Sequence, residues 1–256
     1  MPLGEPLRAR NAILCDMTAR VVGKVAALFR YPVKSMSSEQ LETIDVDWYG
    51  FAGDRRWAFV RGDQVRSGFP WLTIRENPKM WHYKPRFVEP DHPDKSATMV
   101  RTPSGDELDV VDPALAEELG HNSRVIKQDR GVFDAFPLSL LTTQSVAALG
   151  ASVGDNLDVR RFRPNLYIES SDGGDAPENS WVGEVLQIGE MRLRVDKRDK
   201  RCVVINVDPV TTVKDPAILR SVAQERDSRF GVYGSPVQPG RVTVGDAVSI
   251  VSLGRR

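Results

Sequence analysis

Residues 185–209 have the sequence VLQIGEMRLRVDKRDKRCVVINVDP, and this stretch favours a mainly β fold. Short runs of β-forming residues cover 185–188 and 191–195, and Gly189-Glu190 between them predicts a tight hairpin turn. We expect a further strand over 203–207, which leads into Asp208-Pro209. The stretch therefore predicts three short strands within 25 residues.

Similar runs, separated by Gly, Pro and Asp, recur along the chain. Helices are few: one is predicted between the N-cap Asp112 and Gly120, one over 143–149 with Gly150 ending it, and one over 215–224. Many short strands with few helices favour a β-barrel or a β-sandwich. The other predicted strands are 21–31, 41–46, 57–60, 97–101, 108–111 and 166–169, with a closing hairpin over 241–251 around Gly245-Asp246.

The chain has 256 residues, enough for one large β domain or two smaller ones. The charged stretch HNSRVIKQDRG is the most natural boundary, because it lies between the predicted helix ending near Leu119 and Val132. We therefore predict a flexible N-terminal tail over 1–19, a first β domain over 20–120 and a second over 121–256.

Composition argues against several classes of protein. Lys plus Arg equals Asp plus Glu, at 35 each, which disfavours a dedicated nucleic-acid-binding protein but permits a local basic pocket. The two cysteines, Cys15 and Cys202, are too few for a disulfide framework, a four-cysteine zinc site or an intrinsic iron–sulfur cluster. No segment reaches the ~20 apolar residues of a membrane span and no signal sequence is visible. We expect no membrane partner and a cytoplasmic location.

Cys202 is the leading candidate for chemistry. Six basic residues precede it within residues 192–201, ending in Arg201, and only Asp196 and Asp199 oppose them. Basic neighbours stabilise a thiolate, which is both a nucleophile and a soft metal ligand. The alternative is a buried, inert cysteine, since free cysteines are often buried.

Three other segments place basic side chains beside turns. Lys34 and Ser35 follow a predicted strand, where they meet either an anion or only solvent. Arg75 ends an apolar run, so it needs an anionic partner if it points inward, either a ligand or a structural carboxylate. The motif RRFRPN over 160–165 places three arginines within four residues. A bound anion would stabilise this arrangement. The alternative is that the three arginines form a charged, solvent-exposed rim of a barrel. The candidate ligands in this motif are Arg161, Arg163 and Asn165.

In this order the segments resemble the MOSC family, the molybdenum-cofactor sulfurase C-terminal-like domains, and especially its two-part members related to the mitochondrial amidoxime-reducing component. The resemblance covers about residues 20–251 and implies an N-terminal β-barrel-like domain followed by a MOSC β-barrel. It is carried by YPVKS (31–35), GFAGDRRW (50–57), LTIRENPKM (72–80), RFRPN (161–165), Arg201-Cys202 before Val207-Asp208-Pro209, and VTVGD (242–246).

The resemblance implies a pyranopterin molybdenum cofactor between the two domains. Cys202 would supply its thiolate to the molybdenum, and Asp208 is a second candidate catalytic residue, although its place beside Pro209 favours a turn. Basic side chains and one thiolate are the ligand types that a polyanion with a soft dithiolene needs. The residues that would hold the cofactor are Lys34, Ser35, Arg75, Arg161, Arg163, Asn165 and Arg201.

The activity that this resemblance implies is molybdenum-dependent reduction of N-hydroxylated small molecules. The chain shows no cysteine-rich ferredoxin segment, so electrons would come from a separate protein, and we expect a monomer or a weak dimer. Two alternatives stay open: a carrier of persulfide sulfur on Cys202, and a cofactor carrier without turnover. No pyridoxal phosphate domain is visible.

The sequence departs from the family pattern at two places. Asn206 stands where relatives commonly have threonine. Asp134-Ala135-Phe136-Pro137 lacks the small hydroxyl residues that some relatives place before this proline, so hydroxyl contacts to a cofactor are not expected there.

Overall fold

The computed structural model describes residues 18–64 and 66–252. Most of the predicted N-terminal tail, with Cys15, therefore lies outside the described residues. The described part is mainly β, as predicted, and no helix in it is long and apolar enough to cross a bilayer.

Seven strands close into a barrel, because β11 pairs with β10 on one side and with β1 on the other. The barrel prediction is confirmed. In β13 the apolar residues Met191, Leu193 and Val195 are buried in the barrel core, whereas Arg194 between them is exposed. The barrel strands are β1 (Thr18–Arg30), β10 (Leu138–Thr142), β11 (Leu166–Ser170), β12 (Val185–Ile188), β13 (Met191–Lys200), β14 (Arg229–Gln238) and β16 (Ala247–Ser252), and β2 (Glu39–Leu41) extends the sheet along β1.

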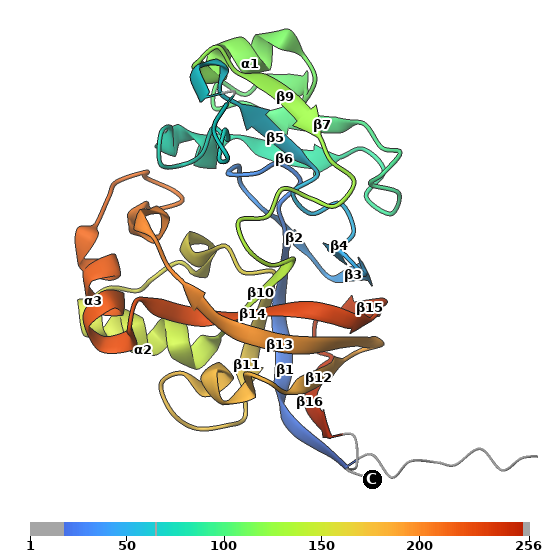
Figure 1. Cartoon of the computed structure of the whole chain (residues 1–256), viewed down its shortest axis with the longest axis vertical. Helices are drawn as coiled ribbons and strands as arrows, with labels where there is room; N and C mark the ends of the chain where they lie inside the picture. Colours follow the sequence, from blue (N-terminus) through green and yellow to red (C-terminus); the bar gives the residue numbers. More distant parts are fainter. Residues whose placement is uncertain (1–17, 65, 253–256) are drawn as a thin grey trace, which may run out of the picture.

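Smaller sheets lie at one end of the barrel (Figure 1). One joins β15 (Gly240–Thr243) to β3 (Thr43–Asp47) and β4 (Gly50–Phe51). The others pair β5 (Trp57–Val60) with β9 (Arg124–Lys127), and β6 (Lys84–Phe87) with β7 (Thr98–Arg101) and β8 (Glu107–Asp109). A second apolar core, with Phe59, Leu72 and Trp81, lies at the β5–β9 and β6–β7–β8 sheets, whereas Ile44 and Val242 of the β15–β3–β4 sheet pack in the barrel core.

The α-helices are α1 (Pro113–Leu119), α2 (Thr143–Val153) and α3 (Pro216–Arg226). Figure 1 shows α1 among the small sheets, and α2 and α3 together at one side of the barrel. Five short 3₁₀ segments complete the described chain: η1 (Gly62–Gln64), η2 (Pro78–His82), η3 (Val159–Phe162), η4 (Pro177–Trp181) and η5 (Val203–Asn206). Because β1 belongs to the barrel, the barrel takes strands from both ends of the chain. The domain boundary near 119–132 stays a prediction.

Two predicted β elements are wrong. Residues 203–207 are not a strand: η5 forms there, and the carbonyls of Ile205 and Asn206 accept hydrogen bonds from the Arg161 guanidinium instead of from a strand. Residues 241–251 are not a hairpin, because the two arms pair with different strands in different sheets. The Val25 amide donates to the Asp246 carbonyl at 2.9 Å, so β15 pairs with β3 while β16 pairs with β1 and β12.

Several boundaries also differ, two of them for a clear structural reason. The predicted strand 41–46 is divided at Glu42 between β2 and β3, which belong to different sheets. Helix α2 continues through Gly150 and ends at the left-handed Gly154. Gly150 serves close packing there, since a Cβ on it would lie 2.6 Å from the Asp155 carbonyl oxygen.

Candidate functional site

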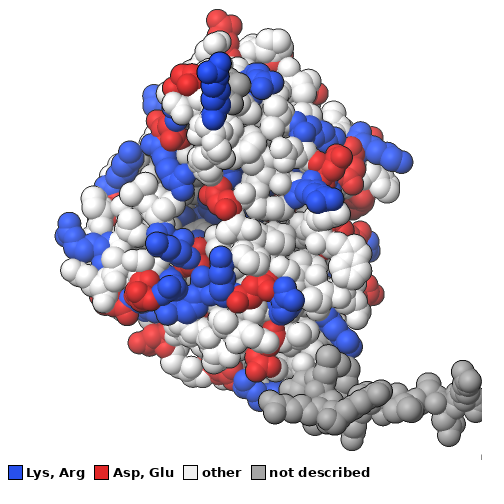
Figure 2. Space-filling model, in the orientation of Figure 1, with Lys and Arg blue, Asp and Glu red and all other residues white. Residues whose placement is uncertain are grey.

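A cavity of about 450 Å³ opens between the barrel and the smaller sheets, and Figure 2 shows basic side chains gathered around a hollow on this face. Its lining contains ten basic residues against two acidic ones, Asp134 and Asp199. The chain as a whole is neutral, so the cavity concentrates positive charge. The basic residues are Lys34, Arg55, Arg75, Arg161, Arg163, Lys197, Arg198, Lys200, Arg201 and Arg229.

The segments that the sequence singled out meet in this cavity. Ser35 lies in the turn after β1, Arg163 caps η3, and Cys202 lies between β13 and η5. Three lining residues that are not glycine have left-handed backbones, at φ 68° for Ser35, 50° for Arg55 and 54° for Arg163. Such backbones are unfavourable for residues with a Cβ and gather at functional sites.

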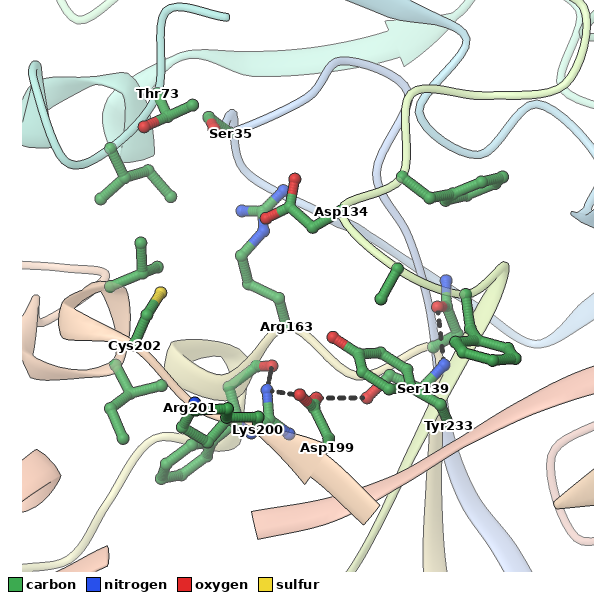
Figure 3. A pocket seen from close by; sticks show the side chains of 18 of the residues that line it. Ser35, Thr73, Asp134, Ser139, Arg163, Asp199, Lys200, Arg201, Cys202 and Tyr233 are labelled. Carbon is green, nitrogen blue, oxygen red and sulfur yellow. Dashed lines mark hydrogen bonds and ion pairs between the residues drawn. The ribbon is translucent and has the colours of Figure 1, made fainter. Parts of the chain in front are cut away.

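Cys202 is half-buried and is the free cysteine of the described chain. Its Sγ accepts a hydrogen bond from Arg75 Nη2 at 3.2 Å. The Arg75 guanidinium also lies 5.2 Å from the centre of the Phe69 ring. Arg75 is exposed, so it needs no buried anionic partner, and its side-chain hydrogen bond goes to this sulfur from the other part of the chain; Figure 3 shows Cys202 facing the cavity.

Four arginines that line the cavity each keep one buried nitrogen without a hydrogen-bond partner in the described structure. The atoms are Arg161 Nε, Arg163 Nη2, Arg198 Nε and Arg201 Nη2. A buried donor left unpaired costs about 1–3 kcal/mol, and more when it is charged. These atoms have almost no accessible surface, so it is the ten basic residues of the lining as a whole that suit a ligand with several negatively charged oxygens.

Arg163 lies at the centre of the site. It stacks 4.2 Å from the Tyr31 ring centre and 4.8 Å from that of Trp81, and it donates to the Met36 carbonyl at 2.7 Å. Burial first, and neighbouring Arg55 to a smaller extent, lower the pKa of Arg163 to about 10, against the opposing effect of Tyr31. Arg163 remains a cation at neutral pH, in surroundings that a bound anion would stabilise.

Lys34 is buried and forms an ion pair with Asp134, and its ammonium also donates to the Val132 carbonyl at 3.1 Å. Burial lowers the pKa of Lys34, and Asp134 opposes that shift. Burial alone would raise the pKa of Asp134, but Lys34, Arg75 and Arg55 together hold it below its usual value. The pair is therefore charged at neutral pH and stands at the edge of the cavity.

Asn165 is fully buried and every polar atom of its amide is used. Its Nδ2 donates to the Phe29 carbonyl and to Asp54, both at 3.2 Å. Its Oδ1 accepts from the Ser139 amide and from Arg55, both at 3.3 Å. Asn165 therefore joins β1, β10 and the turn that carries Arg55, and it lines the cavity as part of a fixed network.

Asp208 is the one predicted site residue that does not line the cavity. Its Oδ1 accepts from the Val210 amide at 2.9 Å and from the Thr211 amide at 2.8 Å, which makes a turn. Its Oδ2 accepts from Arg161 at 2.8 Å. Arg161 does reach the cavity, but most of its donors hold η5 and this turn in place, directly after Cys202.

The two segments that depart from the family pattern, at Asn206 and at residues 134–137, make defined contacts. Asn206 accepts from the Leu219 amide at 2.9 Å and so fixes α3 against η5. Phe136 stacks on Tyr233, with ring centres 5.7 Å apart, on the cavity wall.

Several lining residues are not among the predicted site residues, including Arg55, Asp134, Ser139, Asp199 and Tyr233. Arg55 was visible within GFAGDRRW, and Asp199 within the basic run before Cys202. Ser139 and Tyr233 carry no local signal, because β10 and β14 bring them to the site from distant segments.

The comparisons with known proteins agree with this arrangement. A family profile described as "MOSC N-terminal beta barrel domain" matches residues 22–131, and one described as "MOSC domain" matches residues 127–249. The Bacillus subtilis YuaD protein has a similar structure, with a TM-score of 0.52 at 12% identity, over 92% of this chain and 98% of that one. This likeness concerns the fold alone.

Two curated relatives bear on function. Molybdenum cofactor sulfurase of Caenorhabditis elegans is 25% identical over 244 residues, which cover 82% of this chain and 33% of that protein. Human mitochondrial amidoxime-reducing component 1 is 32% identical over 131 residues, which cover 46% of this chain and 38% of that protein. The chain thus spans about a third of the length of these relatives.

Proposed function

Because the chain belongs to the MOSC-domain family, with the MOSC N-terminal β-barrel region preceding the MOSC domain, we propose that its cavity binds a pyranopterin molybdenum cofactor and reduces N-hydroxylated small molecules. One observation carries this proposal: the cavity lining combines the Cys202 sulfur with ten basic side chains. A soft ligand beside a polyanion cradle is the combination that this cofactor requires.

The proposed cofactor-binding residues come from both sides of the cavity. Lys34, Ser35 and Arg75 face the cavity from the smaller-sheet side, while Arg161, Arg163, Asn165 and Arg201 face it from the barrel side. Lys34, Ser35, Arg75, Arg163 and Arg201 would hold the phosphate and the pterin. Asn165 and Arg161, whose polar atoms mostly bond within the protein, would fix the cavity wall. Cys202 would be the protein ligand of the molybdenum, kept in place by η5 and oriented by Arg75. When bound, the cofactor supplies two-electron redox chemistry, and the protein supplies binding, orientation and protons.

Turnover of an N-hydroxylated compound tests the activity. We expect the cofactor-loaded protein to reduce benzamidoxime with a chemical reductant and, in the cell, with electrons from a separate electron-transfer protein. Cofactor-loaded protein that reduces no N-hydroxylated compound would contradict the proposed activity. We also propose a cytoplasmic location and a monomer or weak dimer.

Replacing Arg163 should weaken cofactor retention. Arg163→Met keeps much of the side-chain length but removes the buried guanidinium between Tyr31 and Trp81. Losing one partner of a buried charged contact costs about 2–5 kcal/mol, which is roughly 30-fold or more in affinity. Pterin content after gel filtration measures the loss. The matched control is Arg194→Met on the exposed side of β13, which should retain the cofactor; equal retention by both variants would contradict the assignment of Arg163.

A sulfur carrier is the second candidate function, favoured by the relative named molybdenum cofactor sulfurase, which matches 82% of this chain. In that case the half-buried Cys202 would hold a persulfide beside Arg75. Mass spectrometry after exposure to a cysteine desulfurase should then find a labile sulfur on Cys202. A mass without added sulfur would exclude this alternative.

A further inference from the structure

Two aromatic rings form part of the cavity lining, and neither belongs to the cofactor-binding residues proposed above. Phe136 and Tyr233 stack with their ring centres 5.7 Å apart and their ring planes 20° apart. Both side chains line the cavity and both are half-buried, so each ring keeps part of its surface exposed. We call these two residues the aromatic wall. The Lys197 ammonium lies beside it, 4.8 Å from the centre of the Phe136 ring, and also lines the cavity.

The aromatic wall and Lys197 are held in place by the fold. Lys197 and Tyr233 are opposite each other in β13 and β14, so the strand pairing sets their spacing. Phe136 lies in the segment before β10, and the ion pair between Lys34 and Asp134 ties this segment to the turn after β1. A ligand that packs against the wall therefore orders few side chains on binding, which favours affinity.

The charge of Lys197 is available to a ligand. Asp196 and Asp199 are its acidic neighbours on β13, but each has another partner. Asp196 pairs with Arg194 at 2.7 Å. Asp199 pairs with Arg201 at 2.9 Å. Lys197 is exposed and has no carboxylate partner within residues 18–64 and 66–252, which the structure describes. An unpaired ammonium at the edge of an aromatic surface suits a planar ring that bears an anionic group.

The aromatic wall lies across the cavity from the sulfur. Figure 3 shows Cys202 at one side of the cavity and Tyr233 at the other, with the Tyr233 ring pointing into the space between them. A molecule that packs against the wall and extends into this space directs its far end toward Cys202. Since Cys202 is the proposed ligand of the molybdenum, that far end is where a reducible group would have to lie.

We propose that the aromatic wall and Lys197 form the substrate subsite, and that it selects N-hydroxylated aromatic compounds that carry a carboxylate. This inference rests on the proposed function and names its substrate class. The aromatic ring of the substrate packs against Phe136 and Tyr233, its carboxylate pairs with Lys197, and its N–O group points toward Cys202. The lining has ten basic residues against two acidic ones, so its positive potential also disfavours cationic substrates.

Kinetics with three benzamidoximes test the inference on the cofactor-loaded protein. We expect the lowest KM for 4-carboxybenzamidoxime, a higher one for neutral benzamidoxime and the highest for cationic 4-(aminomethyl)benzamidoxime. Lys197→Met should raise the KM of the carboxy compound about 5-fold, the upper range for a solvent-accessible ion pair, and should leave that of benzamidoxime unchanged. The kcat should not change, because the subsite holds the substrate and the transition state equally.

Two further variants complete the test. The matched control is Lys24→Met, which removes an exposed lysine of β1 that pairs with Glu169 at 3.1 Å outside the cavity lining, and it should keep the wild-type kinetics. Phe136→Leu should raise the KM of both benzamidoxime and its carboxy derivative about 2- to 10-fold, because an aromatic contact is lost. The KM of acetamidoxime, which has no ring, should not change in Phe136→Leu.

Calorimetric titration with 4-carboxybenzamide, which has no N–O bond to reduce, supplies a readout without turnover. Its Kd should rise about 5-fold in Lys197→Met and stay unchanged in Lys24→Met. Pterin content should be the same in wild type, Lys197→Met and Phe136→Leu.

The outcomes separate the inference from the proposed function. Reduction of benzamidoxime and 4-carboxybenzamidoxime with equal KM would overturn the inference and leave the proposed function standing. Loss of pterin from Phe136→Leu would assign the aromatic wall to the cofactor and would also overturn the inference. Cofactor-loaded wild type that reduces no N-hydroxylated compound would overturn the proposed function, and the substrate subsite with it.

Discussion

Cys202→Ala should abolish reduction of N-hydroxylated compounds while the protein still folds and still holds pterin. Cys202 is half-buried, and the contact that the side chain makes is the one with Arg75, so its loss leaves the barrel core intact. Mutations of residues that merely orient a metal ligand typically cost 10–100-fold, so removal of the ligand itself should cost more than about 100-fold in rate.

The absorption spectrum and molybdenum content of wild type and Cys202→Ala measure this effect, beside the rate. We expect the sulfur-to-molybdenum absorption to disappear and the bound pterin to remain, because the basic residues are untouched. Cys202→Ser is the matched variant, which keeps the size of the side chain and replaces the soft sulfur by a hard oxygen. An unaltered spectrum in Cys202→Ala would show that Cys202 is not a ligand.

Asp54→Ala should cause a large loss of stability. Asp54 is 1% exposed, accepts from the Tyr31 amide at 2.7 Å and forms an ion pair with Arg55, whose side chain is 13% exposed. Its removal leaves the largely covered Arg55 guanidinium without that partner, and breaking a buried pair from one side costs about 3–5 kcal/mol. For a chain of this size the midpoint of thermal unfolding should fall by roughly 6–20 °C.

Asp45→Ala is the control for Asp54→Ala. Asp45 forms a two-point ion pair with Arg241, at 2.8 and 3.0 Å, but both side chains are about 60% exposed. Exposed pairs contribute little, so the unfolding temperature should hardly change. Calorimetry of the two variants separates the cases. Equal temperatures for both would show that the buried Asp54–Arg55 pair does not hold the turn after β4.

Much of the fold could be predicted from local pattern. Strand β5 and helix α1 have the predicted bounds, since runs of β-forming residues and capping residues act within a few positions. Segments that depend on distant partners could not be predicted. Residues 203–207 have the composition of a strand, but Arg161 takes their carbonyls and a 3₁₀ turn results. Residues 241–251 resemble a hairpin, but one arm pairs with β3 and the other with β1 and β12.

In the candidate site, too, residues in local motifs could be predicted and residues brought in by distant strands could not. Residues within conspicuous motifs, such as Arg163, Asn165 and Cys202, all reach one cavity. Tyr233 and Ser139 lie in ordinary strands, and only the barrel register brings them beside Asp199. Asp199 itself was visible as a charge opposing the basic run, but sequence alone does not reveal that it is buried.

Molybdenum and pterin content of the purified wild-type protein is the most direct test of the cofactor site. The chain should be expressed with ample cofactor supply, and metal should be measured by elemental analysis and pterin by fluorescence after release. We predict stoichiometric molybdenum and pterin in the wild type, and a marked loss of both in Arg163→Met. Wild-type protein that is folded and contains neither molybdenum nor pterin would contradict the account.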